Sequence, residues 1–248
     1  MTTGLQLAID TLTPREAVAL VERVHPSIDL IEAGTPFIKR FGLGVLDLFR
    51  RVAPNKLIVA DLKAMDAGAY EASIAFDAGA DIMTVLGCAS DETILGALHE
   101  ANRRQRCIAV DLIAVPDKLE RARQLENMGV HYICIHAGID QQALGITPLA
   151  DLEQIRLAVS TPLVVAGGIN VNSIHAVASL GPAVVVVGSY ITSASNPEAV
   201  CSALHTALDQ QHLVCDSWQK LAAQKTISWP QERNVMLKWL GRYVSKIA

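Results

Sequence analysis

Acidic residues and one histidine stand at the ends of short apolar segments in this sequence. They are Asp10, Glu32, Asp61, Asp111 and His136, and each lies at or just before the C-terminal end of its segment. If these segments are parallel strands, their C-terminal ends form one rim, where the catalytic groups of α/β barrels gather. The pattern therefore predicts one polar site that could hold a metal, transfer a proton and stabilise a developing negative charge.

The densest group of charges includes Asp61 and Lys63. Side chains two residues apart on a strand share a face, so these two are expected to point the same way. An isolated Asp-x-Lys pair is most simply a structural ion pair, but here Glu32 and Asp111 converge on the same rim. A lysine among carboxylates stays protonated, and Lys63 is therefore expected to stabilise a developing oxyanion.

Glu32 and Asp61 also predict a divalent metal ion. Two carboxylates from neighbouring strands suit Mg²⁺, which keeps water and accepts substrate oxygens at its other octahedral positions. Mn²⁺ accepts the same oxygen ligands. His136 is the natural proton-transfer group because the pKa of free histidine lies near neutrality. A lone histidine is more often a packing or capping residue, and its place at the rim favours the catalytic interpretation.

Glycines follow the last two apolar segments before residue 190. Gly167 and Gly168 end one segment, and Gly188 with Ser189 ends the next. In α/β barrels the loops after the seventh and eighth strands frequently bind phosphate through backbone N–H groups. Either group alone could serve only a tight turn, but the two together on adjacent strands predict a phosphate site.

The elements that must position these residues are eight apolar segments that alternate with longer helix-like stretches. Such alternation is typical of βα repeats, and eight of them close a (β/α)8 TIM barrel of about 250 residues. A doubly wound sheet is the alternative, but it uses fewer strands, and no G-x-G-x-x-G follows the first segment. The expected strands are Leu5–Asp10, Ile28–Ala33, Leu57–Leu62, Ile82–Leu86, Cys107–Leu112, Tyr132–Ala137, Leu163–Gly167 and Ala183–Gly188.

The overall composition argues against several other classes of protein. The 248 residues carry a net charge of -4 and are 51% hydrophobic but only 4% aromatic. This balance gives no basic surface for nucleic acid. The longest stretch without charged residues, 157–197, is broken by glycines and prolines and is not a membrane span. No secretory signal is visible at the start, so a cytoplasmic protein is expected.

The pattern changes from about residue 209, which predicts two parts: a catalytic barrel over 1–208 and a C-terminal helical extension over 209–248. Apolar residues recur in the second part at the spacing of an amphipathic helix, namely Val235, Met236, Trp239, Leu240, Tyr243 and Ile247. An apolar stripe of this size needs a surface to pack on, either its own barrel, a second subunit or another protein.

The rim residues also resemble those of a known family. Asp61-Leu62-Lys63-Ala64-Met65-Asp66 is similar to the D-x-K-x-x-D signature of the orotidine 5′-monophosphate decarboxylase suprafamily. Within it, residues 5 to about 208 resemble the 3-hexulose-6-phosphate synthases. The similarity extends to Glu32-Ala33-Gly34-Thr35-Pro36, Met65-Asp66-Ala67-Gly68, Thr84-Val85-Leu86-Gly87, Val110-Asp111-Leu112 and His136-Ala137-Gly138-Ile139-Asp140.

The resemblance implies an aldehyde-lyase of the ribulose monophosphate pathway of carbohydrate metabolism. Such an aldolase condenses formaldehyde with D-ribulose 5-phosphate to D-arabino-hex-3-ulose 6-phosphate, and catalyses the reverse. The resemblance also implies that Glu32 and Asp61 bind Mg²⁺, with Lys63 beside an enediolate intermediate.

A homodimer with shared active sites is implied as well, in which Asp66 comes from the neighbouring subunit. By the same resemblance Asp10 and Asp111 bind substrate hydroxyls or water, and His136 transfers the proton. The tail after about residue 209 departs from the family, since ordinary members lack it. That departure concerns the assembly rather than the chemistry.

Two related activities and one non-enzymatic alternative remain to be weighed. Nucleotide decarboxylases of the suprafamily continue the signature with Ile-Pro-x-Thr, whereas here Ala67-Gly68-Ala69 follows. The 3-keto-L-gulonate 6-phosphate decarboxylases typically carry Glu where Asp111 stands and Arg where Ile139 stands, so the synthase is favoured. A sugar-phosphate-binding barrel without activity is the third reading, but none of the expected catalytic groups is missing from the sequence.

Overall fold

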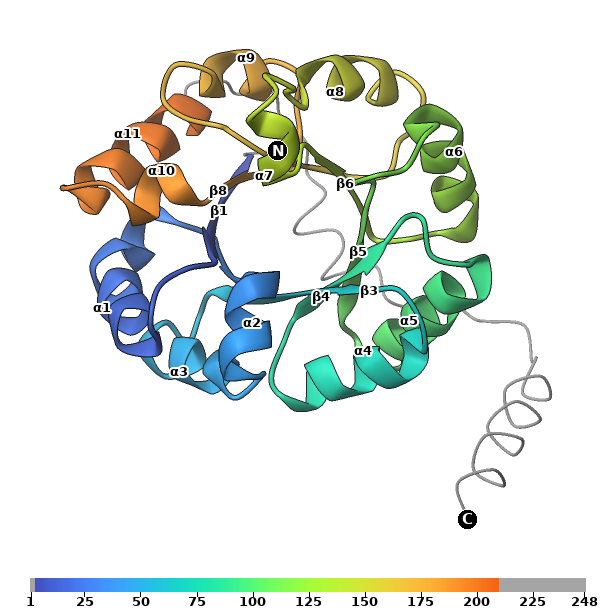
Figure 1. Cartoon of the computed structure of the whole chain (residues 1–248), viewed down its shortest axis with the longest axis horizontal. Helices are drawn as coiled ribbons and strands as arrows, with labels where there is room; N and C mark the ends of the chain where they lie inside the picture. The colour runs from blue at the N-terminus through green and yellow to red at the C-terminus, as the bar shows by residue number, and fades with distance from the viewer. Residues whose placement is uncertain (1–2, 210–248) are drawn as a thin grey trace. The chain divides into compact units, whose positions relative to one another are not determined.

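The computed structural model describes residues 3–209, which form a closed barrel of eight parallel strands in chain order (Figure 1). Each strand pairs with the next, and β1 closes the ring on β8. The predicted (β/α)8 barrel is therefore confirmed. The strands are β1 (Gly4–Ile9), β2 (Leu30–Ala33), β3 (Leu57–Ala64), β4 (Ile82–Leu86), β5 (Cys107–Asp111), β6 (Tyr132–His136), β7 (Leu163–Ala166) and β8 (Val184–Val187).

Helices surround the ring of strands in Figure 1. They are α1 (Pro14–Val24), α2 (Thr35–Phe41), α3 (Val45–Val52), α4 (Gly68–Asp77), α5 (Asp91–Arg104), α6 (Lys118–Met128), α7 (Ile139–Gln142), α8 (Leu149–Ile155), α9 (Ile174–Ala178), α10 (Ser189–Thr192) and α11 (Pro197–Asp209), with a 3-10 turn at His25–Ser27. Local sequence sets their ends. Thr13 and Glu16 form a capping box at the start of α1, and Gly129 ends α6 in the left-handed conformation.

Side chains along each strand point alternately outward, into the hydrophobic core, and inward, toward the interior of the barrel. On β1, Leu5, Leu7 and Ile9 are fully buried in the core between strands and helices. Gln6 and Ala8 instead face the barrel interior, where they line a cavity together with Asp10 just beyond the strand. The period of two along a strand thus places apolar residues outward and the residues that line the cavity inward.

Helix α11 runs to Asp209, the last residue that the structure describes, so the predicted boundary near residue 209 stays a prediction. The predicted extension over the rest of 209–248, with its apolar stripe from Val235 to Ile247, lies outside the described residues. None of the helices within 3–209 has both the length and the uninterrupted apolar character that crossing a membrane requires.

Candidate active site

A cavity of about 1430 Å³ lies inside the barrel and opens among the loops that follow the C-terminal ends of the strands. The structure brings nearly all of the predicted site residues to its wall. They are Asp10, Glu32, Asp61, Lys63, Asp111, His136, Gly167, Gly168, Gly188 and Ser189. Residues from seven of the eight βα units, far apart in the sequence, therefore face one space, as the rim hypothesis predicted.

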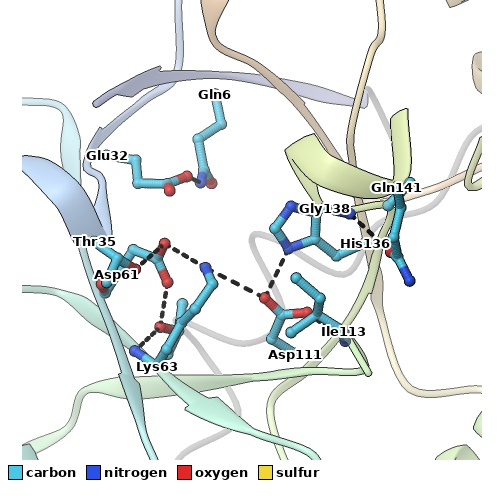
Figure 2. Close-up of polar contacts among 12 residues, drawn as sticks. Gln6, Glu32, Thr35, Asp61, Lys63, Asp111, Ile113, His136, Gly138 and Gln141 are labelled. Carbon is cyan, nitrogen blue, oxygen red and sulfur yellow. Dashed lines mark hydrogen bonds and ion pairs between the residues drawn. The ribbon is translucent and has the colours of Figure 1, made fainter. Parts of the chain in front are cut away.

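Lys63 lies at the centre of the charged groups, between Asp61 and Asp111 (Figure 2). Its Nζ atom is 2.6 Å from Asp61 Oδ2 and 3.5 Å from Asp111 Oδ2. Burial by itself would lower the pKa of Lys63, but the negative charges of Asp61 and Asp111 and the hydrogen bond to Asp61 outweigh it, so the pKa is raised. The ammonium group therefore stays charged and is held in place.

His136 joins this group through Asp111. Its Nδ1 atom lies 2.8 Å from Asp111 Oδ2, and Asp111 Oδ1 accepts the backbone N–H of Ile113 at 2.8 Å. Burial would raise the pKa of Asp111, but the hydrogen bond from His136 and the charges of His136 and Lys63 lower it overall. A carboxylate held by Nδ1 fixes the ring orientation and leaves Nε2 for the reacting groups.

The backbone of β3 is irregular where it carries the signature. Between β3 and β4 the pairing passes from Ala60 with Met83 directly to Ala64 with Val85, so β3 advances four residues against two on β4. Lys63 adopts a left-handed conformation with φ of 49°. The expected proximity of Asp61 and Lys63 is thus real, but it arises from a bulge and not from a regular strand.

Glu32 is buried, and no lysine, arginine or histidine of residues 3–209 forms an ion pair with it. Its Oε2 atom accepts a hydrogen bond from Gln6 Nε2. Burial and the nearby negative charges of Asp61 and Asp10 raise the pKa of Glu32, although Lys63 partly opposes the shift. The pKa of Asp10 is raised as well, by burial first and then by Asp61. These two carboxyl groups therefore ionise less readily than usual while no further cation is bound.

Three further polar residues of the site were not predicted as such from the sequence, although Thr35 and Thr84 lie within the motifs that resemble the family. Thr84 donates to Asp61 Oδ1 at 2.6 Å, Thr35 donates to Asp61 Oδ2 at 2.7 Å, and Gln6 holds Glu32. For two of them the sequence held a signal, because Gln6 on β1 and Thr84 on β4 are polar residues that interrupt apolar segments at inward-facing positions. A polar residue inside an otherwise apolar barrel strand could thus have been assigned to the site.

The glycines after β7 are required by the backbone. Gly167 and Gly168 have φ of 114° and 67°, and a Cβ on Gly167 would stand 2.3 Å from the carbonyl oxygen of Ala137. Gly188 is less constrained, since a Cβ there would meet Ala8 O at an ordinary 3.5 Å. The tight-turn interpretation therefore accounts for Gly167 and Gly168 by itself, and both loops still line the cavity.

Asp66 is the predicted site residue that the chain does not bring to its own cavity. It is exposed, and its Oδ1 atom accepts the backbone N–H of Ala67 at 2.7 Å. Exposed apolar side chains lie nearby in the sequence: Met65 is 52% exposed and Tyr70 on α4 is 70% exposed. Asp66 thus lies on a surface that includes apolar groups, outside the pocket formed by its own barrel.

The charges of the cavity are unbalanced. Among the cavity-lining residues of 3–209 there is one lysine, Lys63, and no arginine, against five acidic residues: Asp10, Glu32, Asp61, Asp111 and Asp140. Within the same part of the chain, no three histidine, cysteine or acidic side chains are placed as ligands of one metal ion. A divalent cation at this site would therefore rely on two protein carboxylates, which suits Mg²⁺, and would offset the excess of negative charge.

Comparison with known proteins places the chain among enzymes of sugar phosphates and nucleotides. The family described as Orotidine 5'-phosphate decarboxylase / HUMPS matches residues 3–204. A 3-hexulose-6-phosphate synthase of Mycobacterium gastri is 42% identical over 207 residues, which cover 82% of this chain and 99% of that protein.

Solved structures of both synthases and decarboxylases are similar to this chain. The 3-hexulose-6-phosphate synthase of Salmonella typhimurium superposes with a TM-score of 0.83 at 39% identity, over 85% of this chain and all of that one. The 3-keto-L-gulonate-6-phosphate decarboxylase of Vibrio cholerae reaches a TM-score of 0.76 at 25% identity, over 85% of this chain and 99% of that one. The similarity to the synthases is thus the stronger of the two.

Proposed function

The chain belongs to the Orotidine 5'-phosphate decarboxylase / HUMPS family, and from this membership and the geometry of the cavity we propose its reaction. It is an aldehyde-lyase that condenses formaldehyde with D-ribulose 5-phosphate to D-arabino-hex-3-ulose 6-phosphate, and catalyses the reverse. The similarity to synthases at about 40% identity over most of the chain supports this assignment. Such a reaction belongs to the ribulose monophosphate pathway of formaldehyde assimilation.

The proposal depends above all on the position of Lys63. Its ammonium group is held between Asp61 and Asp111, and His136 contacts Asp111. Condensation requires a proton to leave C1 of the sugar phosphate. The electron pair of that C–H bond forms the C1=C2 double bond of an enediolate, and negative charge develops on the C2 oxygen. His136 Nε2 takes that proton, and the Lys63 ammonium stabilises the developing charge. Asp111 keeps the imidazole oriented through its contact with Nδ1.

In the second half of the reaction the proton passes from His136 to the product. C1 of the enediolate attacks the carbon of formaldehyde, a C–C bond forms, and the C=O bond of formaldehyde becomes an alkoxide. The proton held on His136 neutralises that alkoxide, so no proton is gained or lost overall. Asp10 lies against the loops at Gly34 and Gly188, where it can accept hydrogen bonds from sugar hydroxyls.

Glu32 and Asp61 are the residues that would hold Mg²⁺, with Mn²⁺ as a substitute. When bound, the ion would act as a Lewis acid toward the oxygens of the sugar. The unbalanced carboxylates and the raised pKa of Glu32 support a cation at this place. Without one, a phosphorylated substrate would bring further negative charge into an already negative cavity.

The phosphate of the substrate binds the backbone N–H groups around Gly168 and Gly188, with Ser189 beside them. Support comes from the lack of arginine among the lining residues that the structure describes. Nearer to the centre, Lys63 is already engaged by carboxylates. At the ends of β7 and β8, glycine lets an anion approach the backbone amides closely, and the Ser189 hydroxyl lies at the same place.

The active enzyme is a homodimer in which Asp66 enters the partner's cavity. Support comes from the exposure of Asp66 and of the apolar groups around it, including Met65, Tyr70, Ile74 and Leu95. Mixing inactive Lys63→Ala with inactive Asp66→Ala protein tests the exchange. After random reassociation about a quarter of the sites should be intact, because half of the dimers are mixed and each holds one complete site. No recovery of activity would contradict a shared site.

The decarboxylation of 3-keto-L-gulonate 6-phosphate is the second candidate, since those decarboxylases share the fold. Ile139, 77% exposed at the mouth of the cavity, gives no cationic proton donor there. An enediolate that is not protonated promptly can meet an aldehyde, so condensation is favoured.

An assay of both substrates decides between the candidates. Purified protein with Mg²⁺ should form hexulose phosphate from formaldehyde and D-ribulose 5-phosphate with a kcat/KM well above that for decarboxylation. The reverse order, or no turnover in either direction, would contradict the proposal. The cytoplasmic location stays a prediction that cell fractionation can test.

A further inference from the structure

The interrupted pairing between β3 and β4 leaves the middle of the signature without a regular ladder. Neither Asp61, Leu62 nor Lys63 pairs with a residue of β4, although Ala60 and Ala64 on either side do. Lys63 also holds the left-handed conformation, which is costly for a residue with a side chain. Something other than the sheet must therefore fix this segment.

The hydroxyl of Thr84 fixes this segment of β3. Thr84 lies on β4 and is 9% exposed. Its Oγ1 atom accepts the backbone N–H of Lys63 at 2.9 Å and donates to Asp61 Oδ1 at 2.6 Å. Because an amide can only donate, the single hydroxyl proton is committed to the carboxylate. One buried atom thus bridges the backbone of Lys63 and the side chain of Asp61.

The remaining contacts of Asp61 show what this bridge controls. With Oδ1 held by Thr84, Oδ2 is turned toward Lys63 Nζ and the hydroxyl of Thr35. The rotamer of the carboxylate and the start of the lysine side chain are therefore set by the same group. A shift at Thr84 would move both members of the pair relative to the substrate.

We infer that Thr84 is a positioning residue, which holds Asp61 and Lys63 in the geometry that stabilises the enediolate. This inference rests on the proposed function. Thr84 does not contact the reacting atoms in this account, and its effect passes through its two neighbours. Its loss should therefore reduce kcat far more than it weakens substrate binding, because the pair acts on charge that develops in the transition state.

The test compares variants that keep or remove the hydroxyl. Thr84→Val keeps the shape and should lower kcat by about 10- to 100-fold, with KM for D-ribulose 5-phosphate within about threefold. Thr84→Ser keeps the hydroxyl and should recover kcat to within about threefold of the unmodified enzyme. Thr93→Val is the matched control, because Thr93 is equally buried but its hydroxyl contacts only Ser90 at 3.2 Å among the described residues.

A second readout does not depend on activity. The Lys63 amide should be protected from hydrogen exchange in the unmodified protein and in Thr84→Ser, and should exchange at least about tenfold faster in Thr84→Val. If Thr84→Val does not fold, Thr84→Ala gives a smaller variant without the hydroxyl.

Two results would overturn the inference: a kcat of the valine variant close to that of the unmodified enzyme, or a serine variant as slow as the valine one. An unmodified enzyme without aldolase activity would instead count against the proposed function, and the amide exchange would still report on the bridge.

Discussion

The two ends of the barrel carry charged clusters of opposite character. Before β4, at the N-terminal ends of the strands, Asp81 lies 2.5 Å from Arg50 and 2.7 Å from Arg106, and it also accepts the backbone N–H of Ile58 at 2.9 Å. At the C-terminal ends, five acidic residues line the cavity, and Lys63 forms ion pairs with two of them, Asp61 and Asp111. In the first cluster both carboxylate oxygens are paired with arginines, whereas the second holds more acidic groups than cations.

This difference separates a structural network from a functional one. Asp81 is surrounded by donors, so the cluster stabilises the fold without further partners. At the rim, burial and repulsion raise the pKa of Glu32. Uncompensated buried charge reduces stability, and such perturbed groups collect at functional sites. The imbalance indicates that the rim is completed by a cation and a substrate.

The largest expected effect is a loss of activity when Lys63, the lysine of the rim, is removed. Lys63→Ala should lower kcat/KM by more than about 10³-fold while the barrel stays folded, because the enediolate loses its stabilising charge. Lys118→Ala is the control, since Lys118 pairs with Asp151 outside the cavity. Steady-state kinetics with a circular dichroism check would show this. Turnover close to normal in Lys63→Ala would remove the proposed mechanism.

A substitution in the Asp81 cluster, at the N-terminal ends of the strands, should lower the stability of the protein and leave its turnover unchanged. Asp81→Ala removes the carboxylate that Arg50, Arg106 and the Ile58 amide share and should lower the free energy of unfolding by about 2 kcal/mol. This is less than the loss from breaking a fully buried pair, because both arginines are partly exposed. Urea unfolding measures the change. A large loss of kcat in folded Asp81→Ala would show that the two ends are coupled.

The smallest expected effect is a pH dependence of metal binding. The pKa of Glu32 is raised, so in the metal-free protein its proton must leave before Mg²⁺ binds. Affinity should be full above that pKa and should weaken, by up to about tenfold per pH unit, as the pH falls below it. Calorimetric titration at several pH values tests this. Glu32→Gln should bind Mg²⁺ weakly and lose this part of the pH dependence.

The sequence allowed much of the architecture to be predicted. The eight strands and the polar site at their C-terminal ends follow from the eight apolar segments and from where Asp10 and His136 stand. These features depend on local alternation, which a sequence displays directly.

What could not be predicted depends on contacts between strands. The bridge from Thr84 to Lys63 requires the bulge in β3, and the contact of Gln6 with Glu32 requires the register of β1 against β2. Neither is encoded at a fixed spacing along the chain. The role of Asp66 depends on a second copy of the chain, so a single barrel can show only that Asp66 faces outward.

The central claim, that the rim forms an enediolate, can be tested without formaldehyde. In D₂O, enzyme and Mg²⁺ should replace one of the two C1 protons of D-ribulose 5-phosphate by deuterium, because His136 removes it and exchanges with solvent. Proton NMR would follow the loss of that signal. The account predicts stereospecific exchange in the unmodified enzyme and none above background in Lys63→Ala. Full retention of both C1 protons by an enzyme that still forms the hexulose phosphate, or exchange unaffected in Lys63→Ala, would contradict it.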